Sequence, residues 1–221
     1  KNINSSLLDS ITSNNNNNKS NKNIKHSDGL IIIIQTICAS IENLRHPLTK
    51  ITALELLQTF GQYTSDSIRL SRIVPYCVVM LNDTSSIVQA TALKTLTTIL
   101  TYVDNISPVD THIFPDYIFP ALKKFTQTDT DELVRLTYSQ CLLTIAETAR
   151  KFLNMATHLN ILLANNNINI NLNKPKVTLP YDGHYDTDLA IIQDYIKDAV
   201  VEMLQSYAGS KVKRSLLNNI T

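Results

Sequence analysis

Residues 88–103 read VQATALKTLTTILTYV, and their apolar side chains recur every three or four positions. This spacing gathers Val88, Ala92, Leu96, Ile99 and Val103 on one face of an α-helix. Residues 134–152, VRLTYSQCLLTIAETARKF, have the same spacing, whereas the alternation typical of strands is nearly absent. The sequence therefore predicts an all-α fold.

The helical segments repeat along the chain. Val88 and Val134 stand 46 residues apart, and Pro75 and Pro120 stand 45 apart. HEAT and armadillo units, which are helical hairpins, repeat at about 40 to 47 residues. A hairpin of that size cannot bury its own apolar face and is stable only when the next hairpin covers it. The expected architecture is an α-α superhelix of HEAT/armadillo-type hairpins.

Two further units match less closely. Ala53-Leu54 aligns with Ala92-Leu93, 39 residues later, and Val212-Lys213 aligns with Val134-Arg135. With these units included, helices are predicted near residues 29–44, 48–62, 67–81, 85–103, 110–126, 131–160, 186–206 and 210–219.

Two segments fall outside the repeats. Residues 1–27 are rich in Asn, Ser and Lys and bury too little apolar area to offset their ordering entropy, so a disordered tether is predicted there. The solenoid is assigned to residues 28–221, with an Asn-rich insert at about 165–182. The insert is predicted to be a surface loop, with a binding loop as the alternative.

Two features of HEAT units have counterparts in this sequence. A proline within the first helix of a unit removes an amide donor and bends the helix, and Pro75 and Pro120 are expected to do so. An Asp of one unit can also bond an Arg of the next, and Asp129 with Arg135 fits that ladder. Gln89 stands where the preceding unit would have its Arg, so the ladder is predicted to be interrupted there.

Composition limits the partners and the compartment. The chain has 20 Lys+Arg and 19 Asp+Glu, and so small a net charge does not recruit nucleic acid or an anionic membrane. A small basic group near the end is predicted to be a solvated face, with a salt-sensitive contact to acidic protein or lipid as the alternative: Lys211, Lys213 and Arg214. The cysteines lie in apolar stretches without a CxxC pair and predict buried thiols in a reducing compartment: Cys38, Cys77 and Cys141.

No catalytic, cofactor-binding or metal-ligating residues are expected. The glycine-rich loop and the His-Arg-Asp and Asp-Phe-Gly segments that a protein kinase needs are absent. The histidines never fall at metal-ligand spacing with one another or with a cysteine: His26, His46, His112, His158 and His184.

Carboxylates cluster at two places without forming a site. Asp182, Asp186 and Asp188 lack the glycine and the closing glutamate of a calcium loop, so helix capping by Asp186 is the favoured reading. Asp198 and Glu202 lie four residues apart, a spacing that more often marks a solvated helix face than an acid/base couple. This chain is therefore not expected to be an enzyme.

Three segments go beyond a generic HEAT pattern. They are Arg69 to Tyr76, RLSRIVPY, Ile113 to Pro120, IFPDYIFP, and Val134 to Tyr138, VRLTY. Their order and separation resemble the HEAT region of the regulatory subunit 4 family, the vacuolar protein sorting serine/threonine-kinase-like scaffold of class III phosphatidylinositol 3-kinase. The resemblance covers roughly residues 29–221.

This resemblance implies a larger protein, and a chain that opens on Lys1 agrees with that expectation. A protein-kinase-like domain would precede the region and a WD40 propeller would follow it, and ATP and magnesium would belong to the kinase-like domain. The implied partners are the class III phosphatidylinositol 3-kinase catalytic subunit and a Beclin-type subunit. The implied role is non-catalytic scaffolding in autophagy and endosomal or vacuolar sorting, cytoplasmic and peripheral on endosomal and autophagic membranes through the complex.

A second function is compatible with the same fold. A solenoid adaptor grips a linear peptide in its concave groove. Rows of Asn, Trp or acidic residues at the same position of successive second helices would favour that function, and Trp is absent from the chain.

Overall fold

The computed structural model describes residues 29–41, 43–127, 130–168, 185–205 and 210–220. Every regular element within these ranges is a helix, which confirms the predicted all-α fold. The expected tether at residues 1–27 lies outside the described residues, as does most of the expected insert. None of the described helices combines the length and the apolar character that crossing a bilayer requires.

The helices follow one another in chain order, beginning with residues 29–41. The next elements are α2 (Pro47–Gly61), α3 (Asp66–Ile68), the π-helical η1 (Arg69–Ile73), α4 (Val74–Met80) and α5 (Ser86–Thr101). They are followed by η2 (Pro108–Asp110), the π-helical η3 (Phe114–Ile118), α6 (Phe119–Leu122) and η4 (Lys123–Thr126). The last elements are α7 (Glu132–Ile168), α8 (Tyr185–Gln205) and α9 (Ser210–Ile220).

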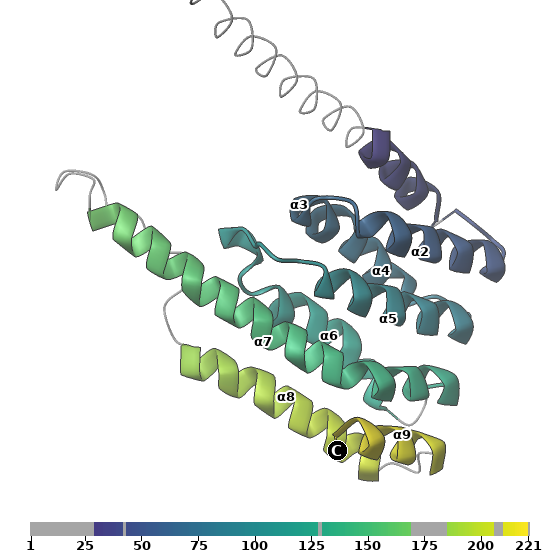
Figure 1. Cartoon of the computed structure of the whole chain (residues 1–221). Helices are drawn as coiled ribbons and strands as arrows, with labels where there is room; N and C mark the ends of the chain where they lie inside the picture. The colour runs from purple at the N-terminus through teal and green to yellow at the C-terminus, as the bar shows by residue number, and fades with distance from the viewer. Residues whose placement is uncertain (1–28, 42, 128–129, 169–184, 206–209, 221) are drawn as a thin grey trace, which may run out of the picture.

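These helices form four layers of hairpins. Layer one is helix 29–41 with α2, layer two is α3 to α4 with α5, layer three is η3 to η4 with α7, and layer four is α8 with α9. The second helices stack on one another: α5 packs between α2 and α7, and α9 packs on α7. Figure 1 shows α2, α5 and α7 side by side, with their first residues along the same side of the stack.

The layers share a single hydrophobic core. It runs continuously from Ile34 in the first helix to Leu216 in α9. Leu96 of α5 and Ile145 of α7 are 1% and 2% exposed, which confirms that the helical face predicted from the apolar spacing is the interior one. Each hairpin therefore buries its apolar face against its neighbours, as a solenoid requires.

The two prolines act differently from the simple bend expected of them. Pro75 and Pro120 each follow a five-residue π-helical segment by two residues. In both places the residue before the proline donates its N–H five residues back, from Val74 to the Arg69 carbonyl and likewise at the second site. A proline ring would collide with the carbonyl four residues earlier, and the wider π turn relieves that contact. The predicted distortion of the first helix therefore takes the form of a π turn.

Two predicted boundaries are wrong. The helix expected at residues 110–126 begins at residue 113 instead and runs through η3, α6 and η4, as the one expected at residues 67–81 runs through α3, η1 and α4. The helix expected to end near residue 160 continues as α7 to Ile168, so the first four residues of the expected insert are helical. Asparagine disfavours a helix by well under about 1 kcal/mol per residue, which does not suffice to end one that is already formed.

Candidate interaction surface

The starts of the second helices form one edge of the stack, here called the helix-start edge. Lys50 in the first turn of α2 forms an ion pair with Asp83, which precedes α5 in the next layer. Both side chains are largely buried. The other carboxylate oxygen of Asp83 accepts the backbone N–H of Ser85 at 2.9 Å, which fixes the turn. A charged pair thus joins layers one and two.

The next position of this ladder carries no charge. With repeat intervals of 39 and 46 residues, Lys50, Gln89 and Arg135 are equivalent. The Gln89 amide donates to the backbone carbonyl of Asp83 at 2.6 Å, within its own layer. This arrangement agrees with the interruption predicted at Gln89, while the carboxylate of Asp129 lies outside the described residues. Arg135 is buried at the start of α7.

Lys124 supplies a different connection between layers two and three. Its ammonium group donates to the Leu81 carbonyl at 2.7 Å and to the Asn82 side-chain oxygen. Burial lowers the pKa of Lys124 below its ordinary value. The ammonium also lies 4.8 Å from the centre of the Phe125 ring. A lysine of η4 therefore reaches the end of α4 across the layer boundary.

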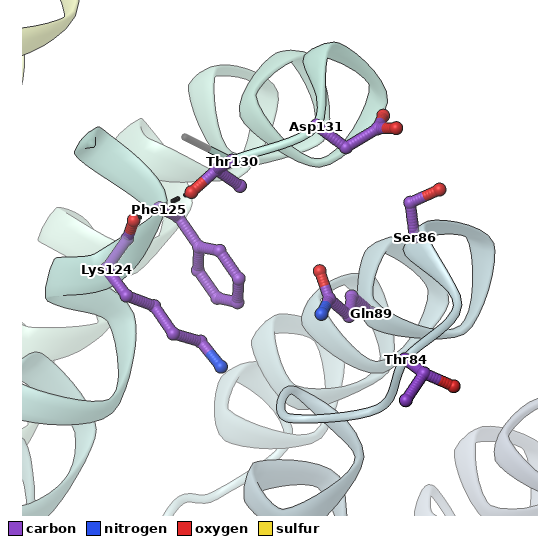
Figure 2. A pocket seen from close by; sticks show the side chains of 7 residues that line it. All are labelled: Thr84, Ser86, Gln89, Lys124, Phe125, Thr130 and Asp131. Carbon is purple, nitrogen blue, oxygen red and sulfur yellow. Dashed lines mark hydrogen bonds between the residues drawn. The ribbon is translucent and has the colours of Figure 1, made fainter. Parts of the chain in front are cut away.

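A hollow of about 330 Å³ opens beside this connection, and we call it the interlayer hollow. Figure 2 shows Gln89 facing it from the α5 side, while the Phe125 ring and the Lys124 ammonium face it from layer three. Its wall is mostly polar and consists of Thr84, Ser86, Gln89, Lys124, Phe125, Thr130 and Asp131. The hollow therefore separates the starts of α5 and α7, where the charged ladder stops.

An exposed aliphatic side chain stands at the start of each of these second helices. Leu48, Ile87 and Leu133 are equivalent by the same intervals and are 64%, 53% and 42% exposed; we call them the apolar row. A threonine four residues later donates its hydroxyl to the carbonyl of each member: Thr52 to Leu48 at 3.0 Å, Thr91 to Ile87 at 2.9 Å and Thr137 to Leu133 at 2.9 Å. The layers therefore present the same local structure at the helix-start edge.

The opposite edge, where α2 and α5 end, is closed by a buried arginine. Arg69 donates to the carbonyls of Gly61 at 2.7 Å, Gln62 at 3.1 Å and Tyr102 at 3.0 Å. It also forms an ion pair with Asp66. Carbonyls at the end of a helix have no partner within the helix, so one guanidinium completes two helices. This role was not predicted from the sequence.

The residues considered for metal binding or catalysis do not converge in the described part of the chain. Within it, no three His, Cys, Asp or Glu side chains are placed to hold a metal ion. His46 caps α2 by accepting the Leu48 N–H at 3.3 Å, whereas His26 and His184 lie outside the described residues. The expectation that this chain has no catalytic, cofactor or metal site remains a prediction.

The carboxylates and basic groups near the C-terminal end also stay apart. Asp186 and Asp188 lie in the first turn of α8, while Asp182 lies outside the described residues. Asp198 and Glu202 are exposed on α8, as expected for a solvated face. In α9 the basic group divides into two exposed residues and one half-buried residue: Lys211 and Arg214, and Lys213.

The three cysteines are free, and none is exposed. Cys38 and Cys77 are buried, as predicted, and Cys141 is half-buried. Burial raises the pKa of Cys38 to about 11 and raises the pKa values of the other two thiols as well. A thiol that stays protonated is a weak nucleophile and a weak metal ligand.

Comparison with known proteins identifies relatives across most of the chain. Residues 33–221 match the family described as "PIK3R4-like, middle domain". The chain is 28% identical over 217 residues to the "Probable serine/threonine-protein kinase vps15" of Dictyostelium discoideum, covering 96% of this chain and 11% of that protein. It is 30% identical over 203 residues to "Serine/threonine-protein kinase VPS15" of Saccharomyces cerevisiae, covering 90% of this chain and 13% of that protein. It is 38% identical over 126 residues to the Arabidopsis thaliana protein of the same name, covering 57% and 8%. The chain thus spans about a tenth of the length of these relatives.

Proposed function

This chain belongs to the PIK3R4-like middle-domain family, and from that premise we propose that it is a non-catalytic scaffold segment of a class III phosphatidylinositol 3-kinase regulatory subunit. Its continuous core, which runs through all four layers, is the observation that carries the proposal. A stack with one continuous core holds its two ends at a set separation, as an arm between two domains must.

The proposed partners are the lipid kinase catalytic subunit and a Beclin-type subunit. The proposed setting is autophagy and endosomal or vacuolar sorting, with the complex peripheral on those membranes. The nearly balanced charge of the chain supports contact with proteins rather than direct contact with a membrane or nucleic acid. ATP and magnesium are assigned to a kinase-like domain elsewhere in the full-length protein.

The described second helices do not favour the peptide-gripping alternative. An adaptor repeats an Asn or an acidic residue at one position of successive helices. The equivalent exposed positions in this stack are instead Glu55, Lys94 and Gln140, which share neither charge nor hydrogen-bonding character. We therefore retain scaffolding as the proposed function.

A segment exchange in the full-length protein tests the scaffold function. The segment equivalent to residues 33–221 is replaced by a flexible Gly/Ser linker with the same number of residues, which removes the fixed separation, and the lipid kinase subunit is co-purified. We expect the exchange to remove or strongly reduce association, while thermal unfolding of the flanking domains stays unchanged. Undiminished association after the exchange would disprove the proposed function.

A further inference from the structure

The helix-start edge has the features of a protein-docking surface. We propose that the apolar row binds an amphipathic helix of a partner protein, with an aliphatic residue at every seventh position, acidic residues at its end over Leu48 and basic residues at its end over Leu133. This inference rests on the proposed scaffold function and adds to it the surface used and the chemistry of the occupant.

The spacing of the row fits an α-helix. Packed helices lie about 8 to 10 Å apart, and α5 packs between α2 and α7, so equivalent positions on these helices are expected to repeat at about that interval. Seven residues of an α-helix rise about 10.5 Å and return to nearly the same face. An extended strand covers that distance in about three residues, which leaves successive contacts on opposite faces. A β-strand peptide therefore does not place an apolar side chain on every layer, whereas a polyproline II peptide, at about 9 Å per three-residue turn, would do so and is distinguished from an α-helix by its circular dichroism.

The charges beside the row select an orientation. Exposed Arg45 lies three residues before Leu48, whereas exposed Asp131 and Glu132 immediately precede Leu133. An occupant with acidic residues at the Leu48 end and basic residues at the Leu133 end matches both ends.

A side chain caps the helix at each end of the row, a neutral imidazole at Leu48 and a carboxylate at Leu133. His46 Nδ1 accepts the N–H of Leu48 at 3.3 Å, and Asp131 Oδ1 accepts the N–H of Leu133 at 2.8 Å. This hydrogen bond holds the Asp131 carboxylate at the start of α7, beside Leu133. In α9, the exposed Lys211 takes the equivalent position and ends the row at Leu133.

The interlayer hollow lies between the second and third members of the row. Ser86, the neighbour of Ile87, and Asp131, which caps Leu133, both line it. Its polar wall predicts a polar occupant side chain at this point, and an uncharged one avoids the Lys124 ammonium that faces the hollow. The occupant's aliphatic stripe is thus expected to be interrupted by a polar residue between its second and third contacts.

A synthetic helix tests the surface with the chain itself. The probe is a fluorescently labelled peptide of about 21 residues with leucine at every seventh position, glutamates in its first turn and lysines in its last turn. Fluorescence anisotropy against the purified chain should show saturable binding that weakens with added salt, because charged ends contribute. Ile87→Asp should weaken binding at least tenfold. Leu56→Asp, an exposed position on α2 outside the row, is the matched control and should bind as the parent chain does.

Several results would overturn the inference. These are absence of saturable binding, equal binding of a peptide with serine in place of its glutamates and lysines, equal loss in both variants, or a bound peptide without helical circular dichroism. Self-association of the chain that Ile87→Asp abolishes would assign the row to a second copy instead. Circular dichroism and thermal unfolding of each variant verify that it is folded.

The two proposals fail separately. If the segment exchange removes the lipid kinase subunit but the peptide does not bind the row, the scaffold function stands and the docking surface is wrong. If the exchange leaves the complex intact, the scaffold function is wrong whatever the peptide does.

Discussion

Arg69 completes the carbonyl ends of two helices in different layers, since its guanidinium bonds Gly61 and Gln62 at the end of α2 and Tyr102 at the end of α5. The carboxylate of Asp66 balances its charge and also accepts the backbone N–H of Asn105 at 2.9 Å. One buried ion pair therefore fixes a turn in each of two layers.

Arg69→Ala should be strongly destabilising. The change leaves three carbonyls and the Asp66 carboxylate without their partner, and breaking a buried pair in this way costs about 3 to 5 kcal/mol. Urea unfolding followed by circular dichroism measures the loss. Arg72→Ala, at an exposed position three residues later, is the control and should change stability by less than about 0.5 kcal/mol. Similar stabilities of the two variants would contradict this role for Arg69.

Gly61 allows the end of α2 to approach α5. A methyl group at this position would overlap Ile99 Cδ1 and lie 3.4 Å from Ile73 Cδ1. Gly61→Ala should therefore lower the free energy of unfolding by about 1 to 3 kcal/mol through overpacking. In an Ile99→Val background the overlapping atom is gone, so the same change should cost less. A double-mutant cycle in urea measures the coupling, and purely additive effects would disprove the contact.

For single residues, the sequence predicted which apolar side chains are buried but not which hydrogen bonds Arg69 forms. Arg69 lies in one of the segments that resemble the family. Three of its hydrogen-bond partners are backbone carbonyls, which every residue has, so no pattern of side chains could predict them. Leu48 and Ile87 have the same difficulty, because an aliphatic residue in a helix is usually interior. Their exposure depends on which face the neighbouring layer covers.

Among the elements, α8 docks on layer three through aromatic side chains. Tyr195 stacks on Phe119 with ring centres 4.0 Å apart and planes 13° apart. Its hydroxyl also lies 2.8 Å from that of Tyr138 on α7, within hydrogen-bonding distance. Burial raises the pKa of Tyr195 to about 12 and raises the pKa of Tyr138 as well.

This pair predicts a loss of stability in alkaline solution. A tyrosine titrates near pH 10 when unfolded, so between about pH 10 and pH 12 the unfolded chain releases the Tyr195 proton and the folded chain keeps it. The free energy of unfolding should fall as pH rises through this window, by at most about 1.4 kcal/mol per pH unit for this group. Urea unfolding across the window should give a shallower fall for Tyr195→Phe. Tyr63→Phe, at an exposed position, should retain the parent slope.

The long, regular helices were predictable because their apolar spacing continues over several turns. The π turn in the first helix of layer three was not, since its hydrogen bonding depends on where the donor missing at Pro120 falls. The end of α7 was also missed, because a run of asparagines weakens a helix without ending it.

For the whole molecule, the repeat intervals were sufficient to predict the stack. A period of 45 to 46 residues combined with one apolar face per helix leaves few alternatives to hairpins that cover one another. The docking edge needed the structure, because the intervals state which residues are equivalent but not which of them the stack leaves exposed.

The effect of a core substitution should depend on whether it lies in an inner layer of the stack or in the last one. Leu96→Ala, in the layer between α2 and α7, should lower the global free energy of unfolding by about 2 to 5 kcal/mol. Leu216→Ala removes an equally buried side chain from α9, and there we expect local opening of layer four first. Amide hydrogen exchange distinguishes the two results. Equal loss of protection in α2 for both variants would mean that the stack unfolds as one unit.

The π turns ahead of Pro75 and Pro120 have a consequence for protein design. Each π turn contains about one more residue than a turn of an α-helix. Suppose that a designed consensus repeat keeps both prolines but builds the first helix of each unit as a regular α-helix. Every side chain after the missing π turn would then be rotated by about 100° around the helix axis. Removing one residue before each proline is the correction such a blueprint would need.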